Sequence, residues 1–301
     1  MGRRNRKGEN KSPNNQSVEL SKAFVCFALL LFSLVFFLKI SAMNPPTFAP
    51  FRLLRQHFDR LAVILLNSPP AAVVPCGDFA FPADWAKIWN SANIRLCTDG
   101  AANHLMKLCS DGTDQLKVPE LIIGDFDSIS AEARHHFGGF GNCEQRKVPD
   151  QNSTDLTKAL EALGEKHPNL SGILLLGGFH GRFDHVLGAL HALLLHVQQW
   201  PQVPLFAVDN ENVLTVLPEG EMLVELDAER ITGTCGLFPI EQKTLRLTTD
   251  GFQWNLANQC VAFGQLVSSS NCILCPQKSR IKSDGGAVVF TFELREPNKM
   301  L

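Results

Sequence analysis

The chain has 301 residues, of which 45% are hydrophobic and 19% are charged, and its formal net charge is −2. This length allows one large domain or two modest ones, each with a buried core. The near-neutral charge offers no electrostatic footprint for nucleic acid, so nucleic-acid binding is not expected. The 9 cysteines are scattered and odd in number, which is typical of reduced thiols in a cytoplasmic protein rather than of a disulfide framework.

Residues 1–55 form an N-terminal segment that we expect to lie outside the fold. Residues 1–22 are polar and basic, which predicts disorder. Residues 23–38 form a nearly unbroken apolar run, which is short for a membrane-spanning helix. The run fits either the core of a signal peptide or a marginal anchor, and Met43 could be an internal start that omits it. Membrane contact is expected only if residues 23–38 are retained.

Residues 56–212 predict an α/β domain in which short apolar strands alternate with helices. Strands are expected at 61–66, 94–97, 121–124, 173–176 and 203–208. Helices are expected at 84–90, 129–137, 156–163 and 186–197, and a further helix after residue 103 carries the apolar residues of 105–108. Continuous apolar runs are typical of parallel strands that are buried on both faces. The alternation therefore indicates a parallel sheet with helices on both faces, which binds ligands at the carboxyl ends of its strands.

Two aspartates, Asp125 and Asp127, directly follow the expected strand at 121–124. Residues two apart at the end of a strand point the same way, so both carboxylates can face one spot. Such carboxylates repel each other unless a cation lies between them or one takes up a proton. Oxygen ligands suit Mg²⁺, whose coordination is usually completed by waters and substrate phosphates. The alternative is a solvated turn that caps the end of the strand.

The turn after the strand at 94–97 repeats this pattern of acidic and small residues. It begins with Asp99 and Gly100 and continues through Asn103 into a helix. Small residues between a strand and a helix allow backbone N–H groups to approach a phosphate.

A second glycine-rich turn follows the strand at 173–176 and contains Arg182 and Asp184 among three glycines. The planar guanidinium of Arg182 suits phosphate oxygens. The chain has neither a P-loop motif nor a GxGxxG motif, so this turn would bind phosphate in another way.

Asp155 stands at the start of an amphipathic helix, after Ser153 or Thr154 as the N-cap. An acidic residue in the first turn is favoured by the helix dipole. The same side chain could aim at a cation held by Asp125 and Asp127. The sequence leaves both interpretations open.

Residues 213–301 predict an all-β sandwich domain. Short alternating runs replace the helices, at 213–217, 222–226, 232–238, 244–248, 260–267 and 287–293. Trp254 lies in a loop-like stretch, and residues 268–271 place hydroxyl and amide groups at the end of a strand. These residues form either a binding site or a buried tryptophan beside a polar turn. Cys272 and Cys275 form a lone CxxC, which favours two unpaired thiols over a zinc or redox site.

Together these motifs resemble the thiamin pyrophosphokinase family in its eukaryotic form. The blocks are TDGAANHL (98–105), LIIGDFDSI (121–129), PDQNSTDLTKAL (149–160), LLGGFHGRFDH (175–185), CGLFPI (235–240) and WNLANQCVAFGQLVSSSN (254–271). The resemblance implies an α/β ATP-binding domain followed by a β-sandwich thiamin-binding domain, in a homodimer with shared active sites. It also implies a thiamine diphosphokinase, in which the thiamin hydroxyl attacks the β-phosphorus of ATP to give thiamin diphosphate and AMP.

The resemblance also assigns site residues by position. The implied catalytic and Mg²⁺-binding carboxylates are Asp125, Asp127 and Asp155. The implied ATP- and phosphate-binding residues are Asp99, Gly100, Asn103, Gln151, Arg182 and Asp184. Thiamin is expected to meet Trp254, Ser270 and Asn271 of the partner chain, and a flat aromatic face suits the stacking and cation–π attraction of its rings. Mg²⁺ is the implied cofactor and ATP the co-substrate.

Some features depart from the family pattern. His104 stands where many members carry arginine, and Asp184 and His185 match a bacterial form of their block. Two rival functions use the same acids: a Mg²⁺-dependent phosphohydrolase with water as nucleophile, and a nucleotide- or thiamin-sensing module without turnover. The sequence leaves open which aspartate accepts the hydroxyl proton and whether thiamin analogues are accepted.

Overall fold

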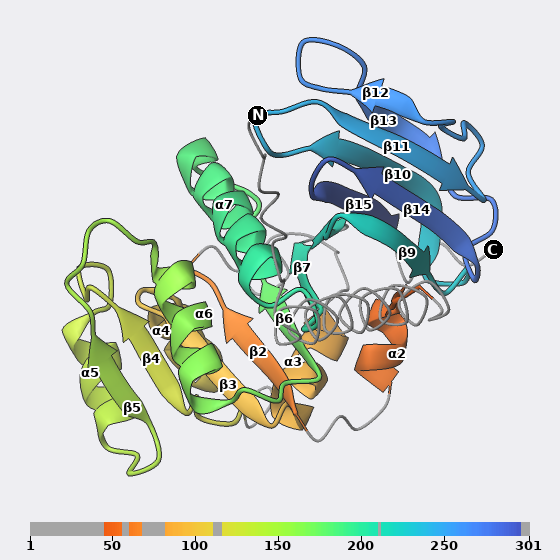
Figure 1. Cartoon of the computed structure of the whole chain (residues 1–301). Coiled ribbons are helices and arrows are strands. Elements are labelled where there is room, and N and C mark those ends of the chain that lie inside the picture. The colour runs from red at the N-terminus through yellow and green to blue at the C-terminus, as the bar shows by residue number, and fades with distance from the viewer. Residues whose placement is uncertain (1–44, 56–59, 68–81, 111–115, 210–211, 296–301) are drawn as a thin grey trace, which may run out of the picture. The chain divides into compact units, whose positions relative to one another are not determined.

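Strands and helices alternate through the first part of the fold (Figure 1), and the computed structural model describes residues 45–55, 60–67, 82–110, 116–209 and 212–295. The elements of this part are β1 (Thr47–Phe48), α2 (Pro50–Arg55), β2 (Leu61–Leu65), α3 (Pro82–Ser91), β3 (Ile94–Thr98), α4 (Ala101–Ser110), β4 (Leu121–Gly124), α5 (Ala131–Gly138), β5 (Glu144–Lys147), α6 (Asp155–Lys166), β6 (Gly172–Leu176), α7 (Phe183–Gln199) and β7 (Leu205–Asp209). The six strands from β2 to β7 pair in parallel in the order β7-β6-β2-β3-β4-β5.

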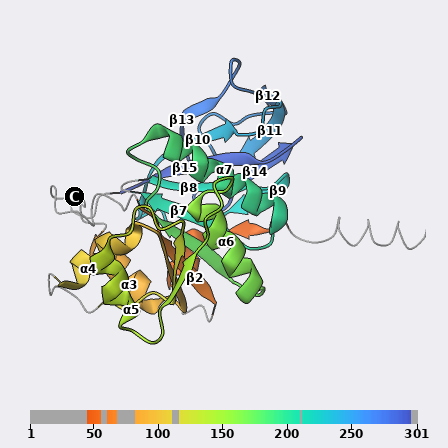
Figure 2. The ribbon, with the colours of Figure 1, turned by 90° about the vertical axis from the view of Figure 1, so that its left-hand side faces the viewer.

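Helices cover both faces of this parallel sheet. Successive strand residues point to opposite faces, so Val63 of β2 packs in the core that includes residues of α3, α4 and α5. Ile64 packs in a separate core with residues of α6 and α7. Figures 1 and 2 show the same two layers of helices from two directions. The predicted α/β sheet with helices on both faces is therefore confirmed.

The remaining strands form an antiparallel sandwich with the parallel sheet extended into it. They are β8 (Asn212–Leu217), β9 (Gly220–Val224), β10 (Ile231–Pro239), β11 (Leu245–Asp250), β12 (Gln259–Val261), β13 (Ser268–Cys272), β14 (Ser279–Asp284) and β15 (Val288–Leu294). β8 pairs antiparallel with β7, which continues the large sheet as β13-β10-β15-β8-β7. The second sheet has the order β1-β9-β14-β11-β12. Inward residues such as Phe290 and Leu247 share one core between the two sheets.

The large sheet continues from β7 to β8 across residue 212, where a domain boundary is expected. The division into two domains there stays a prediction. Of the strand expected at 260–267 only residues 260–261 are extended, in β12, because residues 262–265 turn the chain. Residues 268–271, expected at the end of that strand, form most of a separate strand, β13. β5 and β14 have no counterpart among the expected strands, since their residues are mostly polar or charged.

The expectation that the fold begins after residue 55 is wrong for the last residues of that segment. Thr47 and Phe48 pair in parallel with β9, and Phe48 and Phe51 are buried. The Phe48 ring lies edge-on to Phe206, with 6.2 Å between ring centroids, so apolar burial fixes this stretch to the sheet. The apolar run at 23–38 lies outside the described residues. Within the described ranges, no helix has both the length and the apolar character to span a membrane.

Candidate functional site

The strand order identifies one end of the parallel sheet as the place for a ligand. The chain adds β3, β4 and β5 on one side of β2, then crosses over and adds β6 and β7 on the other side. The strands that follow β2 and β6 in the chain, β3 and β7, therefore lie on opposite sides of the β2–β6 pair. A crevice at such a switch point is where open α/β sheets bind their ligands.

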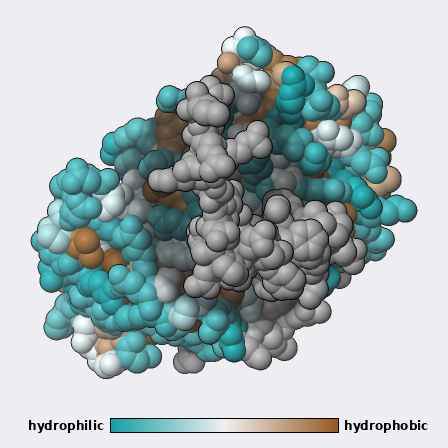
Figure 3. All heavy atoms as spheres, in the orientation of Figure 1, coloured by the Kyte–Doolittle hydropathy of each residue, from teal (hydrophilic) through white to brown (hydrophobic). Residues whose placement is uncertain are grey.

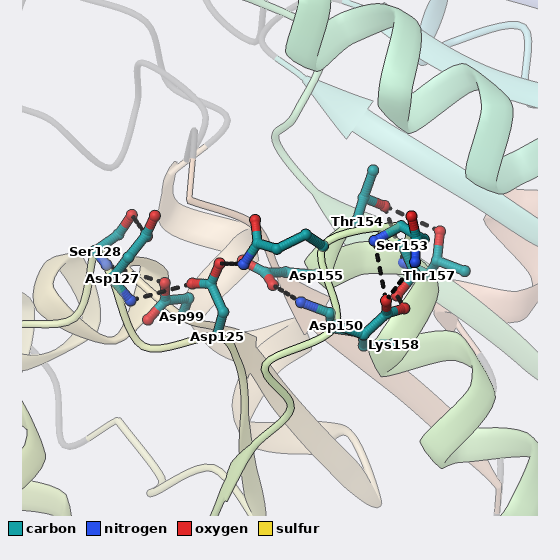
Figure 4. Close-up of polar contacts among 12 residues, drawn as sticks. Asp99, Asp125, Asp127, Ser128, Asp150, Ser153, Thr154, Asp155, Thr157 and Lys158 are labelled. Carbon is teal, nitrogen blue, oxygen red and sulfur yellow. Dashed lines mark hydrogen bonds and ion pairs between the residues drawn. The ribbon is translucent and has the colours of Figure 1, made fainter.

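Three carboxylates meet beside this switch point (Figure 4). Asp99 follows β3, and Asp125 and Asp127 follow β4, and one oxygen of each lies within 4.8 Å of the others. We call these three residues the acid trio. Asp99 is buried, Asp125 is half-buried and Asp127 is exposed. Within the described part of the chain, no other group of histidine, cysteine or acidic side chains comes together in this way.

The backbone between Asp125 and Asp127 is turned rather than extended. Phe126 has φ of 66°, a left-handed conformation that a bulky residue rarely adopts. The N–H of Asp127 donates to Asp125 Oδ1 at 3.1 Å, and Ser128 Oγ donates to Asp127 Oδ1 at 2.6 Å. The turn that the sequence offered as an alternative to a cation site is thus present, and it brings the carboxylates together.

Asp99 supports the loop that carries these acids. Its two oxygens accept hydrogen bonds from the backbone N–H groups of Ser128, at 3.0 Å, and Ile129, at 3.1 Å. Burial nevertheless raises the pKa of Asp99 from 3.8 to about 6, and the nearby charge of Asp155 adds to the rise. A buried carboxylate held close to other acids is electrostatically costly, and a cation would relieve that cost.

Two residues expected to bind phosphate, Gly100 and Asn103, make contacts with neighbouring loops at this edge of the sheet. Asn103 Nδ2 donates to the Ser128 carbonyl and Asn103 Oδ1 accepts from the Ser130 N–H, both at 2.8 Å, so its amide holds the loop after β4. Gly100 faces Asn67 at the end of β2, and a Cβ on Gly100 would lie 2.4 Å from Asn67 Oδ1. A larger residue at position 100 would displace the Asn67 side chain, and no pattern in the sequence points to Asn67.

Asp155 lies next to the acid trio without joining it. Thr154 is the N-cap of α6 and accepts from the Thr157 N–H at 3.2 Å, as predicted. Asp155 is the first residue of the helix, and its Oδ1 pairs with Lys158 Nζ at 3.2 Å. Burial raises the pKa of Asp155, the ammonium of Lys158 opposes the rise, and the charges of Asp125 and Asp127 add to it.

Lys158 was missed by the sequence reasoning, although its spacing of three residues from Asp155 on a helix was a usable signal. Its side chain is 3% exposed, so the ammonium is buried among acids. Gly124 explains how these acids approach each other, since a Cβ there would lie 2.6 Å from Asp99 Cβ and 3.1 Å from Asp155 Cγ.

Gln151 reaches the acid trio from the loop between β5 and α6. Its Nε2 donates to Asp125 Oδ2 at 2.9 Å. This bond, together with the N–H of Asp127, lowers the pKa of Asp125, so that carboxylate is ionised. Within one site, the pKa of Asp125 is therefore lowered while the pKa of Asp99 is raised.

The loop after β6 presents Arg182 and Asp184 on the surface. Arg182 is the N-cap of α7, and its Nη2 pairs with Asp184 Oδ2 at 2.6 Å. Gly177, Gly178 and Gly181 all have positive φ, between 82° and 95°. The predicted arginine and glycines thus lie at a strand-to-helix turn on the same edge of the sheet as the acid trio.

The residues expected on the thiamin side lie together in the sandwich. Trp254 is 57% exposed, so the alternative of a buried tryptophan is wrong. Asn271 is buried, and its amide accepts from the Trp254 N–H at 3.2 Å and donates to the Trp254 carbonyl at 2.9 Å. Ser270 is exposed, with φ of 56°. Asn271 therefore positions the loop that exposes Trp254.

The chain matches two family profiles. Residues 85–204 match "Thiamin pyrophosphokinase, catalytic domain", and residues 222–288 match "Thiamin pyrophosphokinase, vitamin B1 binding domain". The acid trio falls in the first match, and Trp254 falls in the second.

Relatives of known sequence and structure agree with these matches. Thiamin pyrophosphokinase 1 of Caenorhabditis elegans is 31% identical over 249 residues, which are 81% of this chain and 93% of the relative. Thiamine pyrophosphokinase 1 of Oryza sativa subsp. japonica is 32% identical over 223 residues, 69% of this chain and 81% of the relative. The yeast thiamin pyrophosphokinase structure has a TM-score of 0.70 at 23% identity and covers 86% of this chain and 95% of its own. The Candida albicans structure has a TM-score of 0.67 at 19% identity, covering 84% and 95%. The structural likeness shows the shared fold.

Proposed function

Because this chain belongs to the thiamin pyrophosphokinase family, we propose that it transfers a pyrophosphoryl group from ATP to the hydroxyl of thiamin, giving thiamin diphosphate and AMP. The observation that carries the proposal is the acid trio at the carboxyl ends of β3 and β4, beside the switch point of the sheet. Transfer of a phosphoryl or pyrophosphoryl group depends mainly on positioning and on neutralised charge, which this edge of the sheet can supply.

The donor atoms of the acid trio fit Mg²⁺. Three carboxylates within 4.8 Å of one another offer the hard oxygen ligands that this ion prefers. Burial raises the pKa of Asp99 in the absence of a metal, and a bound cation would favour its ionised, ligating form. When bound, Mg²⁺ would neutralise charge on the triphosphate oxygens.

Asp155 is proposed to act beside the metal ligands, as one of the catalytic carboxylates. Its ion pair with the buried Lys158 fixes its position at the start of α6. That placement suits an acceptor for the hydroxyl proton of thiamin, and Asp125 and Asp127 are the alternative acceptors.

Arg182 and the N-terminus of α7 are proposed to hold phosphate oxygens. The guanidinium is exposed and is paired with Asp184, so this pair must rearrange for Arg182 to meet a phosphate. Asp184 itself is negatively charged, and it is better suited to holding the arginine than to binding the nucleotide.

The exposed Trp254 ring is proposed to stack on thiamin, whose thiazolium is a cation. Ser270 would add a hydroxyl, and Asn271 would hold the Trp254 backbone. We propose that these residues come from the partner chain of a homodimer. Large apolar side chains exposed over the sandwich and at the start of α7 support an interface; they are Phe183, Leu187, Phe263, Leu266 and Leu274. Figure 3 shows hydrophobic atoms among polar ones at the tip of the sandwich.

A cytoplasmic location is proposed on chemical grounds. ATP is supplied there, and the cysteines described in the structure, seven in number, are all free thiols. The same thiols include Cys272 and Cys275 of the CxxC.

One assay of AMP formation from ATP and Mg²⁺, with and without thiamin, tests the proposed reaction. The expected result is AMP formation that requires thiamin and is matched by thiamin diphosphate. Release of phosphate products without thiamin would indicate the phosphohydrolase instead. Binding of ATP or thiamin without any product would indicate a sensing module.

A further inference from the structure

A buried carboxylate that the proposed reaction does not use lies at the end of β7. Asp209 is 3% exposed. Its Oδ2 accepts from the Phe179 N–H at 2.6 Å, and its two oxygens lie 2.8 and 2.9 Å from His180 Nδ1. A carboxylate oxygen accepts, so Nδ1 carries the donated hydrogen. A buried carboxylate requires such partners, and both belong to the loop between β6 and α7.

The same loop is held on its other sides by the ends of neighbouring strands. The Gly177 N–H donates to the Val208 carbonyl of β7 at 2.9 Å. Gly178 has φ of +95°, and a Cβ there would lie 2.4 Å from Leu66 Cδ1, directly after β2. The loop between β6 and α7 therefore contacts the ends of both β2 and β7, at the switch point of the sheet.

The position of His180 determines where the next residues of the loop lie. Arg182 is two residues further on and caps α7, which begins at Phe183. A shift of the His180 backbone would move both the guanidinium and the N–H groups at the start of the helix. The His180 side chain is 36% exposed, so it buries little apolar surface, and its main contact is the hydrogen bond to Asp209. We call the contact between Asp209 and His180 the clamp, and it holds the loop that is proposed to bind phosphate.

We propose that His180, held by Asp209, is a positioning residue that presets the loop at 177–182 for the phosphates of the nucleotide. The inference rests on the proposed function and names a further residue of the same site. Pre-organised donors bind a phosphate without first having to be ordered, so loosening the loop weakens nucleotide binding. The thiamin side, which lies in the sandwich, is unaffected.

The test compares His180→Ala and His180→Asn with the wild type, and His191→Ala, an exposed histidine on α7, is the matched control. The measurements are kcat, the KM values for ATP and thiamin, and the Kd of Mg–ATP by titration calorimetry. His180→Ala is expected to raise the KM and the Kd for ATP about tenfold, with kcat changed less than about threefold and the thiamin KM unchanged. His180→Asn places an N–H donor near the position of Nδ1 and is expected to recover most of the affinity. His191→Ala is expected to behave as wild type.

A different pattern overturns the inference. Equal ATP affinity in His180→Ala and the wild type would contradict the inference. A lowered melting temperature with both KM values unchanged would also contradict it, because that result marks a purely structural role. If His180→Ala does not fold, His180→Phe carries the test, because it keeps a ring of similar size and removes the donor. The proposed function fails separately if the wild type forms no AMP from ATP and thiamin. In that case the Kd comparison still decides the role of the clamp, and a wild type that binds no Mg–ATP contradicts both.

Discussion

At the scale of single residues, Asp99 predicts how the stability of the Mg²⁺-free protein depends on pH. Its pKa is raised from 3.8 to about 6, so between these values the folded state binds a proton more tightly than the unfolded state. Stability from protonated Asp99 is therefore present at low pH and is lost as the pH rises through about 6. The full difference, between a pH well above 6 and a pH below 3.8, corresponds to about 3 kcal/mol.

Thermal unfolding in EDTA at pH 7.5 and 5.0 checks this prediction. The wild type is expected to gain stability from Asp99 at the lower pH, on top of the titration of its other acids. Asp99→Asn is expected to show a smaller gain, and to be less responsive to added Mg²⁺ at pH 7.5. Identical pH responses of the two proteins would contradict the assigned cause.

Trp254 predicts a change in thiamin binding without a change in stability. The residue is 57% exposed, so Trp254→Ala removes little buried surface. Loss of stacking and cation–π attraction is worth about 1–2 kcal/mol, which raises the thiamin KM about 5- to 30-fold. Steady-state kinetics should give Trp254→Phe a thiamin KM between those of the wild type and Trp254→Ala. The KM for ATP is expected to be unchanged in both variants. An unchanged thiamin KM in Trp254→Ala would remove Trp254 from the site.

At the scale of elements, Asp99 and Asp155 can approach each other because Gly124, the last residue of β4, has no side chain. A methyl group at Gly124 would lie 2.6 Å from Asp99 Cβ, too close for unstrained packing. Gly124→Ala is expected to cost about 1–3 kcal/mol of stability and to lower kcat/KM more than about tenfold, because Asp99 and Asp155 are pushed apart. Gly141→Ala is the control, since a Cβ there has no atom within 4 Å. Equal kcat/KM for both variants would show that this spacing does not matter.

Elements with a strong apolar pattern could be predicted from the sequence, and polar ones could not. The continuous runs of β2 and β6 identify buried parallel strands, and Thr154 identifies the start of α6. The edge strand β5 reads EQRK, in which no apolar period marks one face. β14 reads SRIKSD, and its two serines lie buried on the same face as Ile281, where their hydroxyls donate to backbone carbonyls.

At the scale of the whole molecule, the strand order decides which distant residues meet. Asp125 and Asp127 are neighbours in sequence, so their association could be predicted. The approach of Asp99 depends on β3 pairing with β4, and the Asp209–His180 contact depends on β7 pairing with β6. Asn67 meets Gly100 for the same reason, since β2 pairs with β3, whereas Lys158 meets Asp155 through the spacing of three residues on α6. Their side-chain types are common elsewhere in proteins, so their roles become visible only in three dimensions.

If the acid trio holds Mg²⁺ during transfer to thiamin, the loss of one of its carboxylates should slow the reaction strongly. The most direct measurement is the rate of AMP formation by Asp125→Asn at saturating ATP and thiamin across a Mg²⁺ titration. Asp284→Asn, an exposed acid paired with Lys282 on the sandwich, is the control. Asp125→Asn is expected to lower kcat at least about 100-fold, and Asp284→Asn is expected to leave it unchanged. AMP formation by Asp125→Asn at the wild-type rate and the wild-type Mg²⁺ dependence would contradict it.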